Sequence, residues 1–203
     1  MGNIVVHNLM SLDGYYAGPN EQVDAIWEFH HPEYKFDRSF HYSNINLLRS
    51  SSTLVIGRKT FLDKFNVNWK DLINDPKTPF FMRDLATQIN DIDKIVVSDS
   101  LTTKTLLSID NTRIIKRGTI VETLKDLKQT SEKNIAIIGS RMLWQDLLTH
   151  DLIDELQLTV APVFSGSGTL LFDHQPGVYL KRLDTRIAEG NIMIVFQVSR
   201  NKP

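Results

Sequence analysis

Short apolar runs without charge recur along the chain and are separated by longer segments with helical spacing. The runs predict strands at residues 4–10, 54–57, 94–98, 112–116 and 135–138. Leu and Ile at helical spacing predict helices over residues 36–50, 80–92 and 121–130, and the last strand leads into a helix that ends near His150. Because strands that alternate with helices form parallel sheets, the pattern predicts an α/β fold.

The pattern changes toward the C-terminal end of the chain. Residues 155–160 alternate between apolar and polar side chains, as a half-buried strand does. Residues 180–189 and 191–199 predict a β-hairpin that turns at Gly190. Antiparallel strands therefore follow the mainly parallel sheet. Residues 66–79 are polar and predict an irregular excursion from it.

Composition limits the class of protein. Hydrophobic residues make up 41% and charged residues 23% of 203 residues, which predicts one globular domain over residues 1–203. The net charge of −1 argues against nucleic acid as a partner. The absence of cysteine excludes disulfides and thiolate catalysis and fits a cytoplasmic protein. No apolar run predicts a membrane span and no signal peptide is evident, so we expect no membrane partner.

Groups that suit phosphate follow three of the predicted strands. Gly57-Arg58-Lys59-Thr60 follows one strand, Ser98 ends the next, and Gly139-Ser140 joins a strand to a helix whose N-cap we expect Ser140 to be. The carboxyl ends of parallel strands meet at one edge, and helix N-termini attract anions. The sequence therefore predicts a site for a nucleotide with several phosphates.

Four segments, in their order and spacing, resemble the dihydrofolate-reductase-like superfamily. They are Ser11–Gly18, Val55–Phe61, Ile137–Leu143 and Asp154–Gly168. The chain more closely resembles the branch related to the reductase domain of the bacterial riboflavin-biosynthesis deaminase/reductase. The resemblance covers residues 4 to about 199. It implies a three-layer α/β fold, with a mainly parallel central sheet flanked by helices and a C-terminal antiparallel hairpin.

The resemblance implies NADPH as the cofactor. In the family, the two glycine turns hold the phosphates of NADPH, and the loop after the first strand covers the nicotinamide. The positions carried over are Ala17, Gly18, Gly57, Arg58, Lys59, Thr60, Ser98, Gly139, Ser140, Arg141, Met142 and Leu143. Arg58 or Lys59 suits the 2′-phosphate that distinguishes NADPH from NADH.

The candidates for catalysis and substrate binding are fewer. Asp13 and His41 are candidates for delivering a proton, and Trp27 and Asp37 for contacting the substrate. Dihydrofolate reductases carry an acidic residue on the first helix, but His41 lies near that position here. They also carry a Gly-Gly pair with a cis peptide where this chain has Gly139-Ser140. The missing acidic residue disfavours dihydrofolate as the substrate, and the Gly139-Ser140 pair disfavours the cis peptide.

The sequence thus indicates an NADPH-dependent reductase that transfers hydride to a C=N or C=O group of a small heterocycle. One candidate substrate is 5-amino-6-(5-phosphoribosylamino)uracil. The alternative is a non-catalytic NADP(H)-binding or ligand-sensing module of the same fold. We expect a small-molecule substrate and a homodimer. We expect no metal, because the histidines lack the spacing of metal ligands. We interpret Gly166-Ser167-Gly168 as a structural turn, since no helix follows it.

Overall fold

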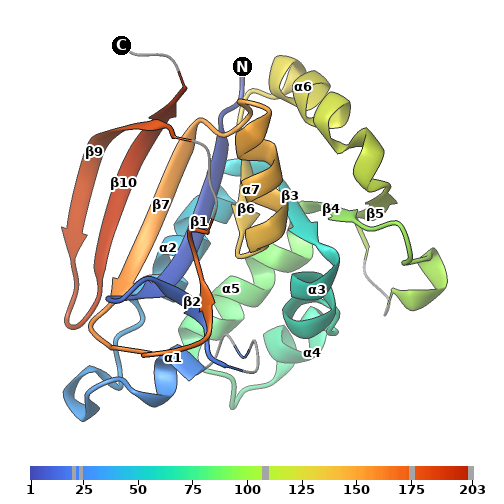
Figure 1. The fold of residues 1–203 in the computed structure, drawn as a ribbon. Helices are drawn as coiled ribbons and strands as arrows, with labels where there is room; N and C mark the ends of the chain where they lie inside the picture. Colours follow the sequence, from blue (N-terminus) through green and yellow to red (C-terminus); the bar gives the residue numbers. More distant parts are fainter. Residues whose placement is uncertain (20–21, 23–24, 107–109, 174–176, 201–203) are drawn as a thin grey trace. The chain divides into compact units, whose positions relative to one another are not determined.

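The computed structural model describes residues 1–19, 22, 25–106, 110–173 and 177–200 (Figure 1). The chain divides into two compact units. The first consists of Met1–Val6 and His41–Ile153, and the second of His7–Phe40 and Asp154–Pro203. Strand β1 (Ile4–Ser11) runs from the first unit into the second. A single domain over residues 1–203 stays a prediction.

The first unit contains a parallel sheet. Its strands are β3 (Ser51–Gly57), β4 (Asp93–Val97), β5 (Thr112–Ile115) and β6 (Asn134–Ile138), in the order β5-β4-β3-β6-β1. The β3–β4, β3–β6 and β4–β5 pairs are all parallel. Each predicted strand is present, with its ends shifted by three residues at most, so the α/β prediction is confirmed for this unit.

Helices cover both faces of this sheet. The helices α2 (Ser39–Arg49) and α5 (Phe80–Asp91) lie on one face. The helices α6 (Ile120–Thr130) and α7 (Arg141–Thr149) lie on the other (Figure 1). The unit therefore has the three layers that the family resemblance implies, with the sheet in the middle.

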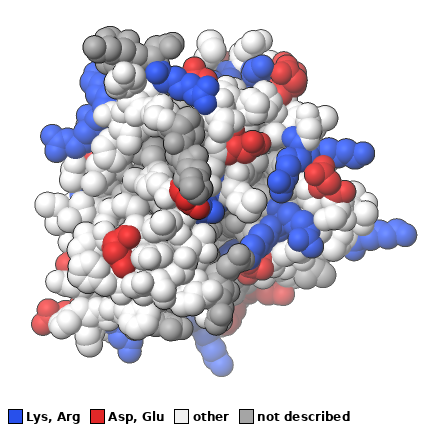
Figure 2. Space-filling view, viewed as in Figure 1, with Lys and Arg blue, Asp and Glu red and all other residues white. Residues whose placement is uncertain are grey.

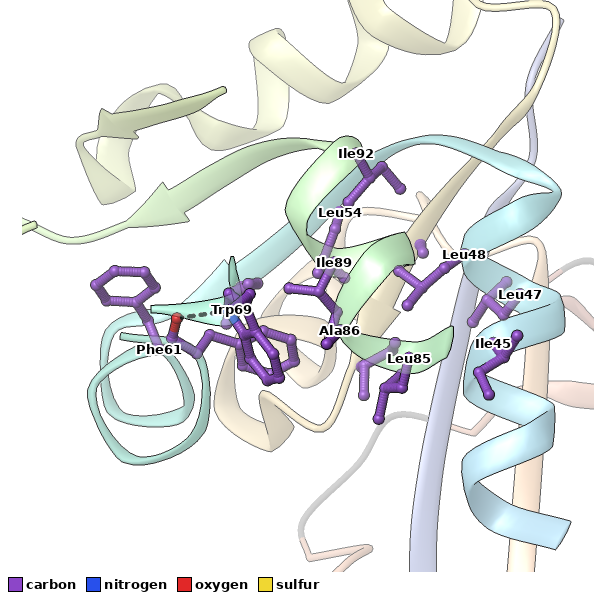
Figure 3. Packing of buried hydrophobic residues seen from close by; sticks show 14 of the residues in the cluster. Ile45, Leu47, Leu48, Leu54, Phe61, Trp69, Leu85, Ala86, Ile89 and Ile92 are labelled. Atoms are coloured by element: carbon purple, nitrogen blue, oxygen red, sulfur yellow. Dashed lines mark hydrogen bonds between the residues drawn. The ribbon is translucent and has the colours of Figure 1, made fainter. Parts of the chain in front are cut away.

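A cluster of buried side chains joins the sheet to α2 and α5 (Figure 3). Leu54 on β3 packs with Ile45 of α2 and Ile89 of α5, and each is at most 2% exposed. Burying one aliphatic side chain contributes about 1.5–3 kcal/mol, so clusters of this kind supply most of the stability of a unit. Side chains alternate along a strand, so the neighbours of Leu54 on β3 point to the opposite face of the sheet, which α6 and α7 cover.

The segment over residues 66–79 is not the irregular excursion that its polar composition predicts. Helix α4 (Trp69–Asn74) lies within it, after the short α3 (Arg58–Thr60) and a π-helical turn at Phe61–Phe65. Trp69 is 9% exposed and donates its indole N–H to the Phe65 carbonyl over 3.2 Å. The prediction was wrong because a single buried tryptophan anchors an otherwise polar helix.

The second unit is mainly antiparallel. Its strands β7 (Glu155–Ala161), β9 (Tyr179–Ile187) and β10 (Ile192–Ser199) follow the order β1-β7-β10-β9. Strand β10 pairs antiparallel with both neighbours, which confirms the predicted hairpin. A separate ribbon pairs β2 (Tyr15–Ala17) with β8 (Thr169–Leu170). The remaining elements are α1 (Ala25–Glu28) and 3-10 turns at Pro32–Tyr34, Thr103–Thr105 and Arg117–Thr119.

Strand β9 is exposed at each of its nine residues, Leu183 and Ile187 among them. The register of β9 against β10 shifts between Arg182 and Asp184, which leaves Leu183 without a partner on β10. The expected homodimer stays a prediction.

Among the helices of the described residues, none has the length and apolar character that crossing a membrane requires.

Asp37 ties the start of α2 to the β9–β10 turn. Its carboxylate accepts backbone N–H groups from Ser39 at 2.8 Å, Gly190 at 2.9 Å and Asn191 at 3.0 Å. The side chain is buried, and a side chain on Gly190 would collide with Tyr34. Burial raises the pKa of Asp37, but the hydrogen bonds from Ser39, Asn191 and Gly190 outweigh it and leave the pKa lowered.

Lys94 is a buried cation at the end of α5. Its ammonium donates to the carbonyls of Ile89 and Ile92, both at 2.7 Å, and to that of Asn90 at 3.4 Å. These carbonyls are acceptors that the helix cannot satisfy itself. Burial lowers the pKa of Lys94 to about 8, against the opposing effect of the Asp93, Asp91 and Asp110 carboxylates.

We expect Asp37→Asn to lower the free energy of unfolding by about 2–3 kcal/mol at pH 7, because an amide NH₂ would face backbone N–H donors. Since the pKa of Asp37 is lower when folded, its contribution exists above about pH 4 and is lost as the pH falls through the folded pKa. Urea unfolding at pH 7 and pH 3 measures this. Asp184→Asn, on exposed β9, serves as the control and should change the free energy of unfolding much less, because its ion pair with Arg186 is exposed to solvent.

We expect Lys94→Met to destabilise the protein by about 1–3 kcal/mol at pH 7, because it removes the donor from three carbonyls. The unfolded lysine titrates near pH 10.4, about two units above the folded one. The unfolded state therefore binds more protons between about pH 8 and pH 10, and wild-type stability should rise there relative to Lys94→Met. Denaturant unfolding across this range, with exposed Lys125→Met as control, tests it. If the difference in the free energy of unfolding between wild type and Lys94→Met narrows as the pH rises, the expectation is contradicted.

Candidate functional site

The candidate phosphate site lies at the carboxyl edge of the first unit's sheet. Strands β3, β4, β5 and β6 are parallel, so their C-terminal ends reach the same edge. Gly57 ends β3, Ser98 follows β4, Lys116 follows β5 and Gly139 follows β6. The structure thus brings together the turns that the sequence analysis selected.

Ser140 locks the two glycine turns together. Its backbone N–H donates to the Thr60 hydroxyl over 3.2 Å. Its own hydroxyl accepts the Gly57 N–H at 3.0 Å and donates to the Ile138 carbonyl at 3.3 Å. Two turns that are about 80 residues apart in sequence therefore hold each other in place through one buried serine.

The predicted role of Ser140 as a capping side chain was wrong. Ser140 occupies the N-cap position of α7, but its hydroxyl bonds to no N–H of the first helical turn. Its φ of 52° and ψ of 43° are left-handed, which directs the hydroxyl toward Gly57 instead. The N–H groups at the start of α7 are thus not capped by this side chain, and they remain at the positive end of the helix dipole.

Gly139 has a φ of 60°, so two left-handed residues occur in succession at this turn. Such a conformation is natural for glycine and costs about 1–2 kcal/mol at a residue with a side chain. The cis peptide of the related reductases has no counterpart among the described residues, where every peptide bond is trans. At Gly57 the backbone is ordinary, and an added Cβ would meet Ser140 at 3.7 Å without strain.

Cations gather at this edge. The side chains of Arg58 and Lys59 are exposed, as are those of Lys116 and Arg117 after β5. The backbone N–H of Arg117 donates to Asp99, which follows β4. Figure 2 shows Lys and Arg side chains around β5 and α3. The sequence analysis missed Lys116, the last residue of a strand that it predicted, and Arg117, which follows that strand.

Other predicted positions are used partly by the fold itself. The Ser98 hydroxyl accepts the N–H groups of Ser100 at 3.2 Å and Leu101 at 3.0 Å, and the residue is buried. Leu143 is buried, whereas Met142 is 69% exposed at the start of α7. Ser98 therefore shapes the turn after β4, and Met142 is the apolar side chain open to a ligand.

The chemistry of this edge fits an anionic nucleotide. An uncapped helix of nine residues, α7, begins there beside a glycine turn. The flanking cations are exposed side chains of the kind that pair with phosphate. A cofactor with several phosphates would satisfy both features at once, with the helix start facing the pyrophosphate and the cations facing a terminal phosphate.

Asp13 lies in the second unit, in the loop after β1. Its two carboxylate oxygens accept the N–H groups of Ser165 at 3.0 Å and Gly166 at 2.8 Å. Burial raises the pKa of Asp13, but hydrogen bonds from the Ser11 side chain, Ser165 and Gly166 outweigh this effect and leave the pKa below its ordinary value. At neutral pH this carboxyl is ionised, so it has no proton to give.

Ala17 and Gly18 are buried beneath the turn after β7. A side chain added at Gly168 would lie 2.1 Å from the Ala17 carbonyl oxygen and 2.8 Å from Gly18. Gly168 also has a φ of 129°, which L-residues rarely adopt. The predicted turn at Gly166-Ser167-Gly168 is thus required by a close approach of two backbones.

The remaining predicted residues are spread over both units. In the second unit, Trp27 lies edge-on to His30 at 5.1 Å and packs against Phe40. Asp37, described above, gives its oxygens to backbone N–H groups. In the first unit, the ring of His41 contacts Phe81 at 5.2 Å. Their roles toward a substrate stay predictions. The described residues hold no group of three or more metal-ligating side chains suited to an ion.

Asn8 on β1 is a polar side chain that the sequence analysis passed over. It is 1% exposed, and neither amide atom has a hydrogen-bond partner among the described residues. An unsatisfied buried polar group costs about 1–3 kcal/mol. The amide is therefore suited to an ordered water or to a polar group from outside the chain. A carboxamide within a predicted buried strand was the available signal.

Comparison with known proteins connects this geometry to a family. The profile of the RibD C-terminal domain matches residues 3–189. The uncharacterized protein YyaP of Bacillus subtilis (strain 168) is 28% identical over 195 residues, which cover 95% of this chain and 93% of YyaP.

Solved structures show the same fold. A Thermotoga maritima diaminohydroxyphosphoribosylaminopyrimidine deaminase/5-amino-6-(5-phosphoribosylamino)uracil reductase matches with a TM-score of 0.63 and 11% identity, over 97% of this chain and 56% of that protein. The dihydrofolate reductase of Enterococcus faecalis, complexed with NADP(H), matches with a TM-score of 0.59 and 14% identity, over 97% and 96%. With this mixed α/β architecture and a match over nearly its whole length, the chain belongs to the RibD C-terminal domain family and has a dihydrofolate-reductase-like fold.

Proposed function

We propose that this protein is an NADPH-dependent reductase that transfers hydride to a C=N or C=O group of a small heterocyclic compound. The observation that carries the proposal is the pair of glycine turns locked by Ser140 at the start of α7, with exposed cations beside them. Membership of a reductase-related family and the likeness to a dihydrofolate reductase complexed with NADP(H) support it.

The first unit supplies the groups for binding the cofactor. The turn at Gly139 and the N–H groups of α7 would hold the pyrophosphate, because they present backbone donors at the positive end of a helix. Arg58 and Lys59 would pair with the 2′-phosphate, assisted by Lys116. When bound, NADPH supplies the hydride from its nicotinamide ring.

Hydride transfer to C=N or C=O must be completed by a proton on the nitrogen or oxygen. The lowered pKa of Asp13 makes its carboxylate an unsuitable donor at neutral pH. This favours His41, the other candidate from the sequence, or a water molecule as the proton donor. The role of Asp13 is then sought in the structure of its loop rather than in proton transfer.

For the substrate we propose a pyrimidine of the type of 5-amino-6-(5-phosphoribosylamino)uracil, rather than dihydrofolate. A pterin is bound through a carboxylate with free acceptor positions. Asp37, the first acid to consider, has both oxygens occupied by backbone N–H groups and is buried. The uracil compound is the substrate printed in the name of a structural neighbour, which supports this choice.

The first test concerns the choice of cofactor. We expect Arg58→Ala to weaken NADPH by roughly 10- to 100-fold, since a charge-assisted hydrogen bond contributes about 1.5–3 kcal/mol, and to leave NADH nearly unchanged. Ser140→Ala removes the hydroxyl that accepts the Gly57 N–H but keeps the backbone N–H that donates to Thr60, so it should loosen the two turns and weaken both cofactors alike. Calorimetric titration of the two variants with NADPH and NADH gives four dissociation constants, which are compared with those of the wild type.

Lys125→Ala serves as a matched control, because Lys125 is an exposed cation of the first unit on α6, paired only locally with Glu122. It should bind both cofactors as the wild type does. Equal losses of NADPH and NADH in Arg58→Ala would show that Arg58 does not read the 2′-phosphate.

The second test concerns the substrate. We expect NADPH oxidation with 5-amino-6-(5-phosphoribosylamino)uracil and none above background with dihydrofolate, followed by absorbance at a fixed enzyme concentration. Tight NADPH binding without turnover of any pyrimidine or pterin in the panel would favour the non-catalytic binding module. Turnover of dihydrofolate at about 1 s⁻¹ or more, within the usual enzyme range, would overturn the assignment of the substrate.

A further inference from the structure

Hydrogen bonds join two segments of the second unit, Leu12–Ala17 and Val163–Leu171. We call this pair of segments the clasp. At one end, the Leu12 N–H donates to the Val163 carbonyl over 2.9 Å. At the other, the Leu171 N–H donates to the Gly14 carbonyl over 2.8 Å, next to the β2–β8 ribbon. The loop after β1 is thus held against the turn after β7 at both ends.

Asp13 closes the middle of the clasp. Its carboxylate reaches across and accepts N–H groups from two consecutive residues, Ser165 and Gly166, one on each oxygen. Gly166 has a φ of 69°, and successive N–H groups around a left-handed residue converge into a concavity that binds anions. The Gly166-Ser167-Gly168 turn therefore builds an anion site, and the protein's own Asp13 occupies it.

The turn has little else to hold it at this point. Among the described residues, the Ser165 hydroxyl bonds within the turn, to the Ser167 carbonyl at 2.9 Å. Phe164 beside it is 73% exposed, and Leu12, which pairs with Val163, is 59% exposed, so neither is anchored by burial. The position of residues 164–167 consequently depends on the carboxylate, because apolar packing does not fix it.

We propose that Asp13 is a positioning residue that fixes the turn at residues 164–167 against the loop after β1, and that it is not the proton donor of the reaction. The part of this proposal that concerns the reaction rests on the proposed reductase function. The loop after β1 is the one that the family resemblance places over the nicotinamide, so its position affects how reactants are oriented and how water is excluded.

Amide hydrogen exchange, followed by NMR in the full-length protein, tests the clasp directly. We expect the Ser165 and Gly166 amides to be protected in the wild type and to exchange at least tenfold faster in Asp13→Ala. Amides of β10 serve as the internal reference for global folding. Ser165→Ala is the matched control, because it removes the hydroxyl bond to Ser167 but keeps the backbone N–H that Asp13 accepts. Equal exchange at both amides in wild type and Asp13→Ala overturns the proposal.

Turnover distinguishes positioning from proton transfer. We expect Asp13→Ala to lower kcat/KM by 10- to 100-fold with the uracil substrate, while the shape of the pH profile of kcat stays the same. Asp13→Asn, which keeps one acceptor oxygen, should recover part of the loss. A pH profile that loses one limb in Asp13→Asn, with both amides still protected, would assign Asp13 to proton transfer and overturn the proposal.

The two proposals fail in different ways. If the wild type binds NADPH but reduces no substrate, the reductase function fails while the exchange experiment still decides whether Asp13 holds the turn. If the wild type is active and the two amides exchange freely, the reductase function stands and the clasp does not.

Discussion

The candidate site of the first unit depends on the left-handed conformation of Ser140. That conformation points the N–H of Ser140 at Thr60 and its hydroxyl at Gly57, so bonds made by Ser140 join β3 and β6 beyond their last paired residues, Val55 and Ile137. A serine capping α7 in the usual way would satisfy the helix and leave the two turns independent. Here the capping bond is given up, which leaves the helix start polar and open while the turns become one rigid edge.

The second unit uses carboxylates for a related purpose. Asp13 and Asp37 each accept N–H groups from residues that are more than 150 positions away in sequence. A charged acceptor makes hydrogen bonds of about 1.5–3 kcal/mol, roughly twice the value of neutral ones. Short loops cannot bury enough apolar surface to hold a fixed position. In this unit an ionised side chain takes over that role at two separate turns, and the lowered pKa of both aspartates is the signature.

Much of the fold was predictable because its strands are short, apolar and well separated. The strand at residues 135–138 and the hairpin at Gly190 follow from local pattern alone. The helix at Trp69 was not, because its anchor is one tryptophan in a polar stretch whose burial depends on tertiary packing. The two glycine turns of the candidate site could be identified from glycines and cations after strands. Their mutual lock could not, since a serine after glycine normally reads as a helix cap.

Asp13 and Asp37 show where sequence reasoning about sites reaches its limit. A lone carboxylate in a loop has the same appearance whether it contacts a substrate or a backbone. The distinction lies in which distant N–H groups the fold delivers to it, and Gly166 and Gly190 were the only local hints. Lys116 illustrates the opposite error, because it was counted as the last residue of a predicted strand and left out of the site, although Arg58 beyond another predicted strand was selected.

The bulge at Leu183 has a consequence for aggregation. A sheet that ends in a long exposed strand invites further strands to add to it and can grow into fibrils. In β9 the extra residue interrupts the register halfway along, with the cations Lys181 and Arg182 before it and the ion pair of Asp184 with Arg186 after it. An incoming strand would lose its alignment at the bulge and meet these charges on both sides of it. The irregularity of the hairpin thus protects an edge that its exposed Leu and Ile side chains would otherwise make adhesive.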